Sequence, residues 1–402
     1  MKPYPIWIEI DLDALAHNLR QVKSWINNKS NILAVVKRDA YGHGALEVAE
    51  EVIRTGVKML GVTDVQEGAS LRKSGIKVPI LVLPGINLNF EEIEELLEYE
   101  LSTVIYSSEI ARTLNKAAQQ RGTKANVHIK IDTGMGRLGI APQEYPVFLQ
   151  EITACKNLSI EGIMTHFACS GRAGKEYTQW QLARFKEALK ASNNSWNKRP
   201  LVHAANSANL IEHPESHFDL VRPGIILYGC YPSDAVERII PLKPVLSLKS
   251  RIKAIKEVSC GCSIGYERSY IVPQDGLVAV IPVGYADGYS RLLSNKAQVL
   301  VKGKRVPVIG NISMDLTIVD ISQVTGVKVG EEVVLIGKQG GEEIRVEEIA
   351  HWMGTIPYEI LTSIGKKVPR IFLKNHQTVE PPRHKVTKEW QRTWIEASKP
   401  SA

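Results

Sequence analysis

Six polar residues, each at the end of a short apolar run or just after one, could take part in proton or electrophile chemistry. They are Lys37, Lys130, Arg137, His166, His203 and Arg222. Four of them are cations at neutral pH, and two are imidazoles, whose ordinary pKa lies near neutrality. A site built from these groups could bind an anion and move protons beside it.

Lys37 is the candidate nucleophile of this set. It follows Val35 and Val36 in the stretch AVVKRDAYGHG, residues 34–44. An apolar setting disfavours the charged ammonium and so lowers the pKa of a lysine. A neutral amine can attack a carbonyl group and form a Schiff base. The sequence therefore predicts a carbonyl-bearing ligand or cofactor at Lys37.

The elements that must position these residues are eight short runs rich in β-branched residues. The runs cover residues 31–37, 59–64, 79–85, 101–107, 126–132, 158–167, 201–206 and 217–225. Between them lie stretches such as EEIEELLEYE and TQWQLARFKEALKAS, whose apolar residues recur every three or four positions, as in amphipathic helices. Eight strands that alternate with helices predict an α/β fold, a parallel (β/α)8 barrel of the TIM type.

A barrel of this kind carries its chemistry at the carboxyl ends of its strands. Each polar residue taken alone could be a satisfied group at a strand mouth, but five strand ends with cationic or imidazole groups on one rim favour a site. Phosphate sites in barrels use the loops after strands seven and eight, which here contain Asn206, Ser207, Gly224 and Ile225. Lysine and phosphate site together predict pyridoxal phosphate as the cofactor.

The pattern of apolar and polar residues changes after Pro241. Alternating runs such as VLSLKSRIKAI and LVAVIPV are separated by glycine-rich turns, which predicts a mostly antiparallel β domain. The opening IWIEIDL also alternates, and we expect it to join this second sheet. The predicted domains are a cofactor-binding barrel over 8–235 and a β domain formed by 1–7 and 240–373. The remainder, 374–402, is expected to be a disordered tail, or a helix in which Trp390 and Trp394 share a face.

Composition excludes several classes of protein. The 402 residues contain no apolar run long enough to span a membrane, and the first residues lack the layout of a signal peptide, so we expect a cytoplasmic protein. The net charge of +7 comes from scattered residues, which argues against nucleic acid as a partner. The five cysteines are expected to be free thiols. Cys260 and Cys262 lack a second cluster, so we expect no metal site.

Nine motifs of the sequence resemble those of the alanine racemases, in the same order and with similar spacing, over roughly residues 6 to 373. They are AVVKRDAYGHG, VHIKIDTGMGRLG, EGIMTHF, VHAANSA, VRPGIILYG, IGYERSY, IPVGYADGYSRLL, NISMD and TIPYEILTSI. The resemblance implies a barrel followed by a β domain, a homodimer with two composite active sites, and pyridoxal phosphate on Lys37. The implied activity is that of an isomerase that interconverts L-alanine and D-alanine and supplies D-alanine for peptidoglycan.

The resemblance also implies two bases, one on each face of the substrate. Lys37 would be one base and Tyr266, contributed by the partner subunit, the other. A free tyrosine has a pKa of about 10, so its neighbours must make it a better base. By resemblance His166 contacts Tyr266, and Arg222 and His203 lie beyond. A nearby cation would keep His166 neutral and able to accept a hydrogen bond from the phenol.

Further roles follow from the same resemblance. Arg222 would face the pyridine nitrogen of the cofactor, and Lys130 matches a lysine that is carbamylated in many relatives. The substrate carboxylate would be held by Arg137 and by the Met314 backbone of the other subunit. The phosphate would be held by Tyr41, Ser207, Gly224, Ile225 and Tyr358. Two interpretations remain open for each of four further residues. Tyr285 and Tyr289 either line the pocket or pack in a turn, and His43 either belongs to the site or caps a helix. Asp315 either orients the Met314 loop or bonds to nearby backbone amides.

Six positions depart from the family pattern, of which Lys367 and Phe372, late in the β domain, are expected to make only local changes. Arg38 replaces a usual alanine and is expected to point away from the site, and Glu267 replaces a usual glycine. Gly171 and Asn311 stand where many relatives have an aspartate and an arginine that line the access corridor. The corridor should therefore be less charged, and the hypothesis that follows is a broader serine and alanine racemase.

Three rival interpretations remain. Basic amino-acid decarboxylases share the barrel but are larger and have other motifs. Non-catalytic pyridoxal phosphate carriers are single barrels and lack Tyr266. A degenerate relative kept as a structural dimer is disfavoured because Lys37 and Tyr266 are both present.

Overall fold

The computed structural model describes residues 4–27, 29–87, 89–169, 171, 174–191, 198–375 and 377–379. The chain forms two compact units, one of Leu15–Leu242 and one of Met1–Ala14 together with Lys243–Ala402. Among the described residues, no helix is both long and apolar enough to cross a membrane.

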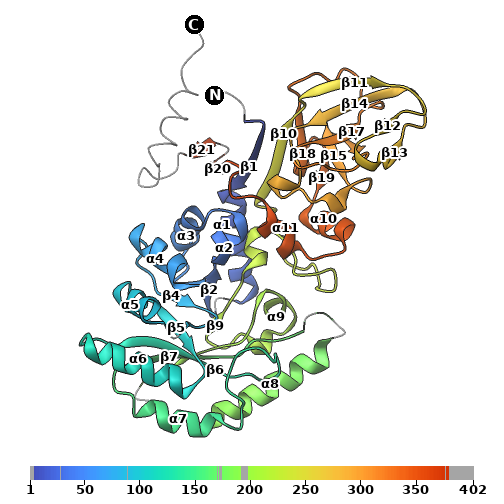
Figure 1. The fold of residues 1–402 in the computed structure, drawn as a ribbon. Coiled ribbons are helices and arrows are strands. Elements are labelled where there is room, and N and C mark those ends of the chain that lie inside the picture. Colours follow the sequence, from blue (N-terminus) through green and yellow to red (C-terminus); the bar gives the residue numbers. More distant parts are fainter. Residues whose placement is uncertain are drawn as a thin grey trace. The chain divides into compact units, whose positions relative to one another are not determined.

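The first unit is built on a closed barrel of eight strands that pair in chain order, each parallel to its neighbours (Figure 1). The strands are β2 (Asn31–Val35), β3 (Met59–Val62), β4 (Ile80–Val82), β5 (Ser102–Ile105), β6 (Ala125–Lys130), β7 (Leu158–Met164), β8 (Leu201–His203) and β9 (Leu220–Val221). Strands β3, β4 and β5 are buried at every residue, as expected where the barrel interior covers one face and helices cover the other. The predicted fold class is confirmed, and all eight strands end before the predicted runs do.

Helices connect the strands of the barrel. They are α1 (Leu12–Trp25), which precedes β2, then α2 (Lys37–Gly42), α3 (Ala45–Arg54), α4 (Val65–Lys73), α5 (Phe90–Glu98), α6 (Ser108–Gln120), α7 (Tyr145–Thr153), α8 (Lys175–Lys190), α9 (Ser207–Glu212) and the 3-10 turns η2 (Pro214–Ser216) and η3 (Ile225–Tyr228). Several begin at a residue whose side chain accepts a hydrogen bond from the first turn, namely Asp64, Asn89, Ser107 and Asn206. These caps fix where each helix leaves the rim of the barrel.

The second unit is made largely of antiparallel sheets. Its largest sheet has the order β16-β15-β18-β10-β1-β20-β21, with β19 paired to β18, and smaller sheets have the orders β11-β14-β17 and β12-β13. Strand β1 (Ile6–Asp11) pairs antiparallel with β10 (Leu246–Arg251) and parallel with β20 (Arg370–Lys374). The alternation of IWIEIDL is thus the alternation of a strand in this sheet.

The remaining elements of the second unit are short. The strands are β11 (Ala254–Val258), β12 (Ser263–Ile264), β13 (Tyr270–Ile271), β14 (Gly276–Ile281), β15 (Gln298–Val301), β16 (Lys304–Pro307), β17 (Thr317–Asp320), β18 (Glu332–Gln339), β19 (Glu342–Ile344) and β21 (Gln377–Val379). The helices and 3-10 turns are η4 (Tyr266–Arg268), η5 (Tyr285–Asp287), η6 (Arg291–Leu293), α10 (Val346–Met353) and α11 (Pro357–Ser363). Of the predicted tail, residues 377–379 pair with β20, while 380–402, with both tryptophans, lie outside the described residues.

Candidate active site

Lys37 lies just beyond the first barrel strand and opens a segment of unusual backbone. Strand β2 ends at Val35, and the four residues Arg38–Tyr41 have φ between 52° and 55°, the left-handed conformation. The prediction that the strand reaches Lys37 is wrong, because the chain turns here. Each left-handed residue with a side chain costs roughly 1–2 kcal/mol, and such strain is typical of functional sites.

Neighbouring groups hold this left-handed segment in place. The Arg38 amide donates to Glu67 Oε1 at 2.6 Å, and Asp39 Oδ1 accepts from the Ala45 amide at 2.8 Å. His43 Nδ1 lies 3.0 Å from the carbonyl oxygens of both Ala40 and Tyr41, so it must be the protonated nitrogen. The open question about His43 is thereby answered, since its ring braces the turn after Lys37. Arg38 is exposed, as expected, although the reason is the turn and not strand alternation.

The rim around Lys37 is electrostatically positive. Burial, and then the charges of Arg137 and Arg38, lower the pKa of Lys37. Burial, and then Arg137 and Arg222, lower the pKa of Lys130 to about 8. A neutral lysine amine is therefore accessible close to neutral pH. The same charges would be stabilised by an anionic ligand.

Asp132 shapes the loop that carries Arg137. Its carboxylate accepts hydrogen bonds from four consecutive backbone amides, those of Gly134, Met135, Gly136 and Arg137, at 2.8 to 3.2 Å. Burial opposes the charged form, but these four bonds outweigh it and lower the pKa of Asp132. The charged carboxylate thus fixes the turn and leaves the Arg137 side chain exposed. The sequence contained Asp132 in the motif, but its role was not predicted.

Arg222 is buried and connects two histidines. Its Nη1 donates to His203 Nδ1 at 3.0 Å, and its Nη2 lies 3.2 Å from His166 Nδ1 and 2.8 Å from the carbonyl oxygens of Thr165 and Ala204. Burial lowers the pKa of Arg222 to about 9, which leaves it charged at neutral pH. A guanidinium only donates, so His203 Nδ1 is an unprotonated acceptor. The two hydrogens of Nη2 are shared among three acceptors, of which His166 Nδ1 is the most distant, and this nitrogen faces the cation with its lone pair.

This arrangement fixes the hydrogen on each imidazole. Burial, followed by the charge of Arg222, lowers the pKa of both His166 and His203 well below the ordinary value, so both rings are neutral. With Nδ1 as acceptor, the hydrogen of His166 lies on Nε2. In that tautomer the other ring nitrogen is a donor, whereas the expectation from the sequence was that this ring accepts a hydrogen bond from a phenol.

A third histidine extends the chain of contacts. His203 Nε2 lies 2.8 Å from His128 Nδ1, and His128 Nε2 lies 3.9 Å from Glu161 Oε2. Ser102 Oγ donates to the same Glu161 oxygen at 2.8 Å. Sequence reasoning missed His128, although it precedes Lys130 by two residues and so shares its face of the strand.

The loops after β8 and β9 form a cradle of small and hydroxyl-bearing groups. The Asn206 side chain caps α9, and Ser207 Oγ accepts from the Gly224 amide at 2.9 Å. A Cβ at Gly224 would lie 2.7 Å from Tyr41 Oη, so the hydroxyl of Tyr41 packs directly on this glycine. Ile225 follows at the start of η3. An amine, a cationic rim and this cradle in one unit fit pyridoxal phosphate.

The other predicted site residues belong to the second unit. Tyr266 lies in η4 with 69% of its surface exposed, and Met314 and Tyr285 are 54% and 44% exposed. The amides of Tyr285 and Ala286 donate to the carbonyls of Ser313 and Met314 at 3.1 and 3.0 Å, so the two loops pack together.

Three further residues named in the sequence analysis lie in the second unit. Asp315 is exposed on the Met314 loop, and Tyr358 lies half-buried in α11. Tyr289 is 2% exposed, which favours the packing interpretation over pocket lining.

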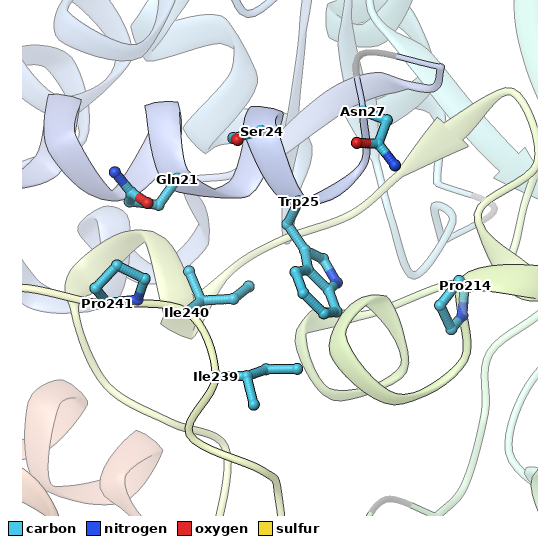
Figure 2. Close-up of a pocket in the computed structure, with 8 residues that line it drawn as sticks. All are labelled: Gln21, Ser24, Trp25, Asn27, Pro214, Ile239, Ile240 and Pro241. Carbon is cyan, nitrogen blue, oxygen red and sulfur yellow. The ribbon is translucent and has the colours of Figure 1, made fainter.

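A pocket of about 390 Å³ lies elsewhere in the first unit, as Figure 2 shows. It is lined by Gln21, Ser24, Trp25, Asn27, Pro214, Ile239, Ile240 and Pro241. None of these side chains titrates near neutral pH, and none belongs to the rim described above. The pocket is therefore not a candidate for proton chemistry.

Comparison with known proteins decides the family. The model of the alanine racemase N-terminal domain matches residues 10–232, and that of the alanine racemase C-terminal domain matches residues 245–372. The chain belongs to the alanine racemase family. The interpretation drawn from the motifs is confirmed. The carrier interpretation is not supported, because carriers of that kind lack the second domain.

Relatives of the alanine racemase family match nearly the whole chain. The alanine racemase of Desulforamulus reducens is 44% identical over 373 residues, which cover 92% of this chain and 99% of the relative. That of Geobacter sulfurreducens is 45% identical over 377 residues, 93% of this chain and 98% of the relative.

Solved structures of the family have the same fold. The alanine racemase of Clostridium difficile 630 superposes with a TM-score of 0.87 at 37% identity and covers 94% of this chain and 98% of its own. An alanine racemase from Bartonella henselae with covalently bound pyridoxal phosphate has a TM-score of 0.81 at 30% identity, covering 92% and 100%. The family is one of pyridoxal-phosphate-dependent isomerases, and this chain is one of its racemases.

Proposed function

We propose that the protein interconverts L-alanine and D-alanine with Lys37 and Tyr266 as two bases on opposite faces of the substrate. The observation that carries this proposal is the barrel rim, where Lys37 follows β2 and Arg222 contacts both His166 and His203; the lowered pKa of Lys37 supports it. Membership of the alanine racemase family supports alanine as the substrate.

Pyridoxal phosphate would supply an electron sink that makes the α-proton of the amino acid removable. Lys37 would hold its carbonyl carbon. The phosphate would be held by the cradle of Tyr41, Asn206, Ser207, Gly224 and Ile225, together with Tyr358. Arg222 would face the ring nitrogen, where a guanidinium that is charged at neutral pH would keep that nitrogen unprotonated.

His166 would prepare Tyr266 for its role as a base. Because Arg222 occupies Nδ1, the Nε2 hydrogen of His166 is available to the tyrosine oxygen. A hydrogen bond to the charged form of a group lowers its pKa, so this donor would favour the phenolate. Tyr266 would take the α-proton of L-alanine in one direction and return a proton to that face in the other.

The substrate carboxylate would be bound by Arg137 and by the backbone of Met314. The guanidinium of Arg137 lies on a loop that Asp132 fixes, and Lys130 lies near enough for each charge to affect the other. Carbamylation of Lys130 would turn this repulsion into attraction. Tyr285 and Asp315 would border the substrate from the second unit.

We further propose a homodimer in which Tyr266 and Met314 complete the active site of the partner subunit. The exposed apolar surface of Tyr266, Met314 and Tyr285 supports this proposal, since such surface is usually covered by a partner. In this arrangement residues 8–235 bind the cofactor, and residues 1–7 and 240–373 supply the second base. The product D-alanine would serve peptidoglycan synthesis in the cytoplasm.

We do not propose the broader specificity for serine. That hypothesis assumed a less charged corridor at Asn311, whereas the structure brings the carboxylate of Glu267 to 3.1 Å from the Asn311 amide nitrogen.

The proposal is tested with α-proton exchange in deuterated water, using L-alanine and D-alanine, while the absorbance of the bound cofactor is recorded. We expect Lys37→Ala to lose both the covalently held cofactor and all racemisation. Tyr266→Phe should keep the cofactor but lose at least about a thousandfold in racemisation, because one face then has no base. Wild-type protein that binds the cofactor at Lys37 yet exchanges no α-proton would refute the proposal.

A further inference from the structure

Asn311 joins the turn that carries Tyr266 to a second loop of the same unit. Its Nδ2 donates to the Tyr266 carbonyl oxygen at 3.0 Å and to Glu267 Oε2 at 3.1 Å. Both partners are acceptors, so the amide nitrogen, with its two hydrogens, must face them. Arg291 Nη2 lies 3.4 Å from the same Glu267 oxygen. One amide and one guanidinium thus converge on the residue next to Tyr266.

The backbone of this turn needs such support. Gly265, Glu267 and Arg268 have φ of 72°, 60° and 52°, all in the left-handed region. Glycine adopts this region freely, but a glutamate and an arginine do so only when their surroundings impose it. Tyr266 lies between these left-handed residues, so its direction depends on whatever holds them.

A second asparagine fastens the other end of the turn. Asn295 Oδ1 accepts from the Gly310 amide at 2.6 Å, and Asn295 Nδ2 donates to the Ser269 carbonyl at 3.3 Å. A Cβ added to Gly265 would lie 3.2 Å from the backbone nitrogen of Asn311, so the two backbones run close together. The segment of Gly310 and Asn311 is therefore a fixed support for the turn.

The two residues that meet here are departures from the family pattern. Glu267 stands at a usual glycine and Asn311 at a usual arginine, and the structure brings these two side chains into contact. The Glu267 and Arg291 side chains are 73% and 51% exposed, so their ion pair contributes little energy. The contribution of the group is consequently one of direction rather than of stability.

We propose that Glu267 and Asn311 are positioning residues for Tyr266, and that Arg291 orients the Glu267 carboxylate. The proposal rests on the proposed function, in which Tyr266 exchanges the α-proton of L-alanine. The side-chain amide of Asn311 donates a hydrogen bond to the carbonyl of Tyr266. The Glu267 carboxylate accepts a second hydrogen bond from the same side-chain amide and so keeps it in place. Loss of either contact lets the left-handed turn relax and moves the phenol away from the substrate.

The test compares Asn311→Ala, Glu267→Ala and Glu267→Gln with wild-type holoenzyme. We expect Asn311→Ala and Glu267→Ala to lower kcat about tenfold with little change in KM, since small displacements of a catalytic group lower kcat steeply. Glu267→Gln keeps an oxygen that accepts from Asn311 and should recover most of that loss. Glu257→Gln, on β11, replaces an exposed carboxylate without these contacts and is the matched control.

Isotope effects separate positioning from a general structural role. With α-deuterated L-alanine the primary isotope effect should rise in the two alanine variants, because proton removal by Tyr266 becomes slower. With α-deuterated D-alanine, whose proton Lys37 removes, it should fall or stay unchanged. Wild-type racemisation combined with unchanged isotope effects and kcat in these variants overturns the positioning proposal alone. Absence of racemisation in the wild type overturns the proposed function instead. Because Glu267 is exposed, its variants are expected to fold, and they test the proposal even if Asn311→Ala does not fold.

Discussion

The buried His128 and His203 and the half-buried His166 are kept neutral by their surroundings at the carboxyl side of the barrel. Burial, followed by Arg222, lowers the pKa of His128 to about 3 and takes those of His166 and His203 well below the ordinary value. Charged imidazoles here would face a guanidinium, so neutrality is a condition of the arrangement. In the proposed mechanism, the hydrogen bond from His166 to Tyr266 depends on this neutrality.

This neutrality predicts how stability changes with pH. A histidine whose pKa is lowered by folding contributes stability above its unfolded pKa, near 6.5, and that stability is lost as pH falls. Each such residue costs up to about 1.4 kcal/mol per pH unit below that point. We expect the urea midpoint to fall between pH 7 and pH 5, and His128→Gln to reduce the slope by one proton. The exposed His351→Gln is the control, and equal slopes in all three proteins would contradict the prediction.

Gly224 offers a second prediction at the scale of single residues. A Cβ at this position would lie 2.7 Å from Tyr41 Oη, and Tyr41 is buried against Tyr228 with ring centroids 5.0 Å apart. Gly224→Ala must therefore displace the hydroxyl from the cradle. We expect pyridoxal phosphate to bind at least about tenfold more weakly, equivalent to 1.4 kcal/mol, in a titration of cofactor-free protein. Gly341→Ala has open space around its Cβ, and a similar loss there would argue against a local cause.

Among the helices, α8 has a role at the rim that its sequence pattern does not reveal. Gln181 is fully buried and accepts from the Ala168 amide at 2.9 Å. Its Nε2 donates to the His166 carbonyl at 3.3 Å and to Thr133 Oγ1 at 3.4 Å. One side chain of α8 thereby joins the loops after β6 and β7.

Replacing Gln181 should affect both stability and catalysis. Gln181→Leu removes the partner of the Ala168 amide and of the His166 carbonyl, two partly buried groups, at a cost of roughly 1–3 kcal/mol. We expect a lower denaturant midpoint and a reduced kcat, because His166 loses a support. Gln179→Leu makes the same change on the exposed face of the same helix. If the two variants behave alike in denaturation and kinetics, the proposed support does not exist.

The elements differ in how far the sequence predicts them. All eight barrel strands were predicted, because short β-branched runs between amphipathic helices have few other solutions. The left-handed run Arg38–Tyr41 was not, since it contains no glycine or asparagine and is imposed by contacts with Glu67 and His43. The contact of Glu267 with Asn311 was also missed, because it joins residues 44 positions apart.

For the whole molecule, the proposed composite site predicts that two inactive variants restore activity to each other. Lys37→Ala and Tyr266→Phe each damage one half of a site. If Tyr266 acts on the partner's site, a mixed dimer has one intact site and one doubly damaged site. Random exchange gives half mixed dimers, so we expect about one quarter of wild-type activity per subunit after mixing and refolding. Mixtures no more active than their components would show that both bases come from one chain.

The concentration of cations at the barrel rim has a consequence for the life of the protein in a cell. Lys37, Lys130, Arg137 and Arg222 repel one another, and Asp132 is engaged by four backbone amides. As long as no anion is bound, this repulsion lowers the stability of the folded protein. A newly made chain would therefore be least stable before it is loaded, and most open to proteases then. The supply of the vitamin-derived cofactor would set how much of the protein survives, as well as how much of it is active.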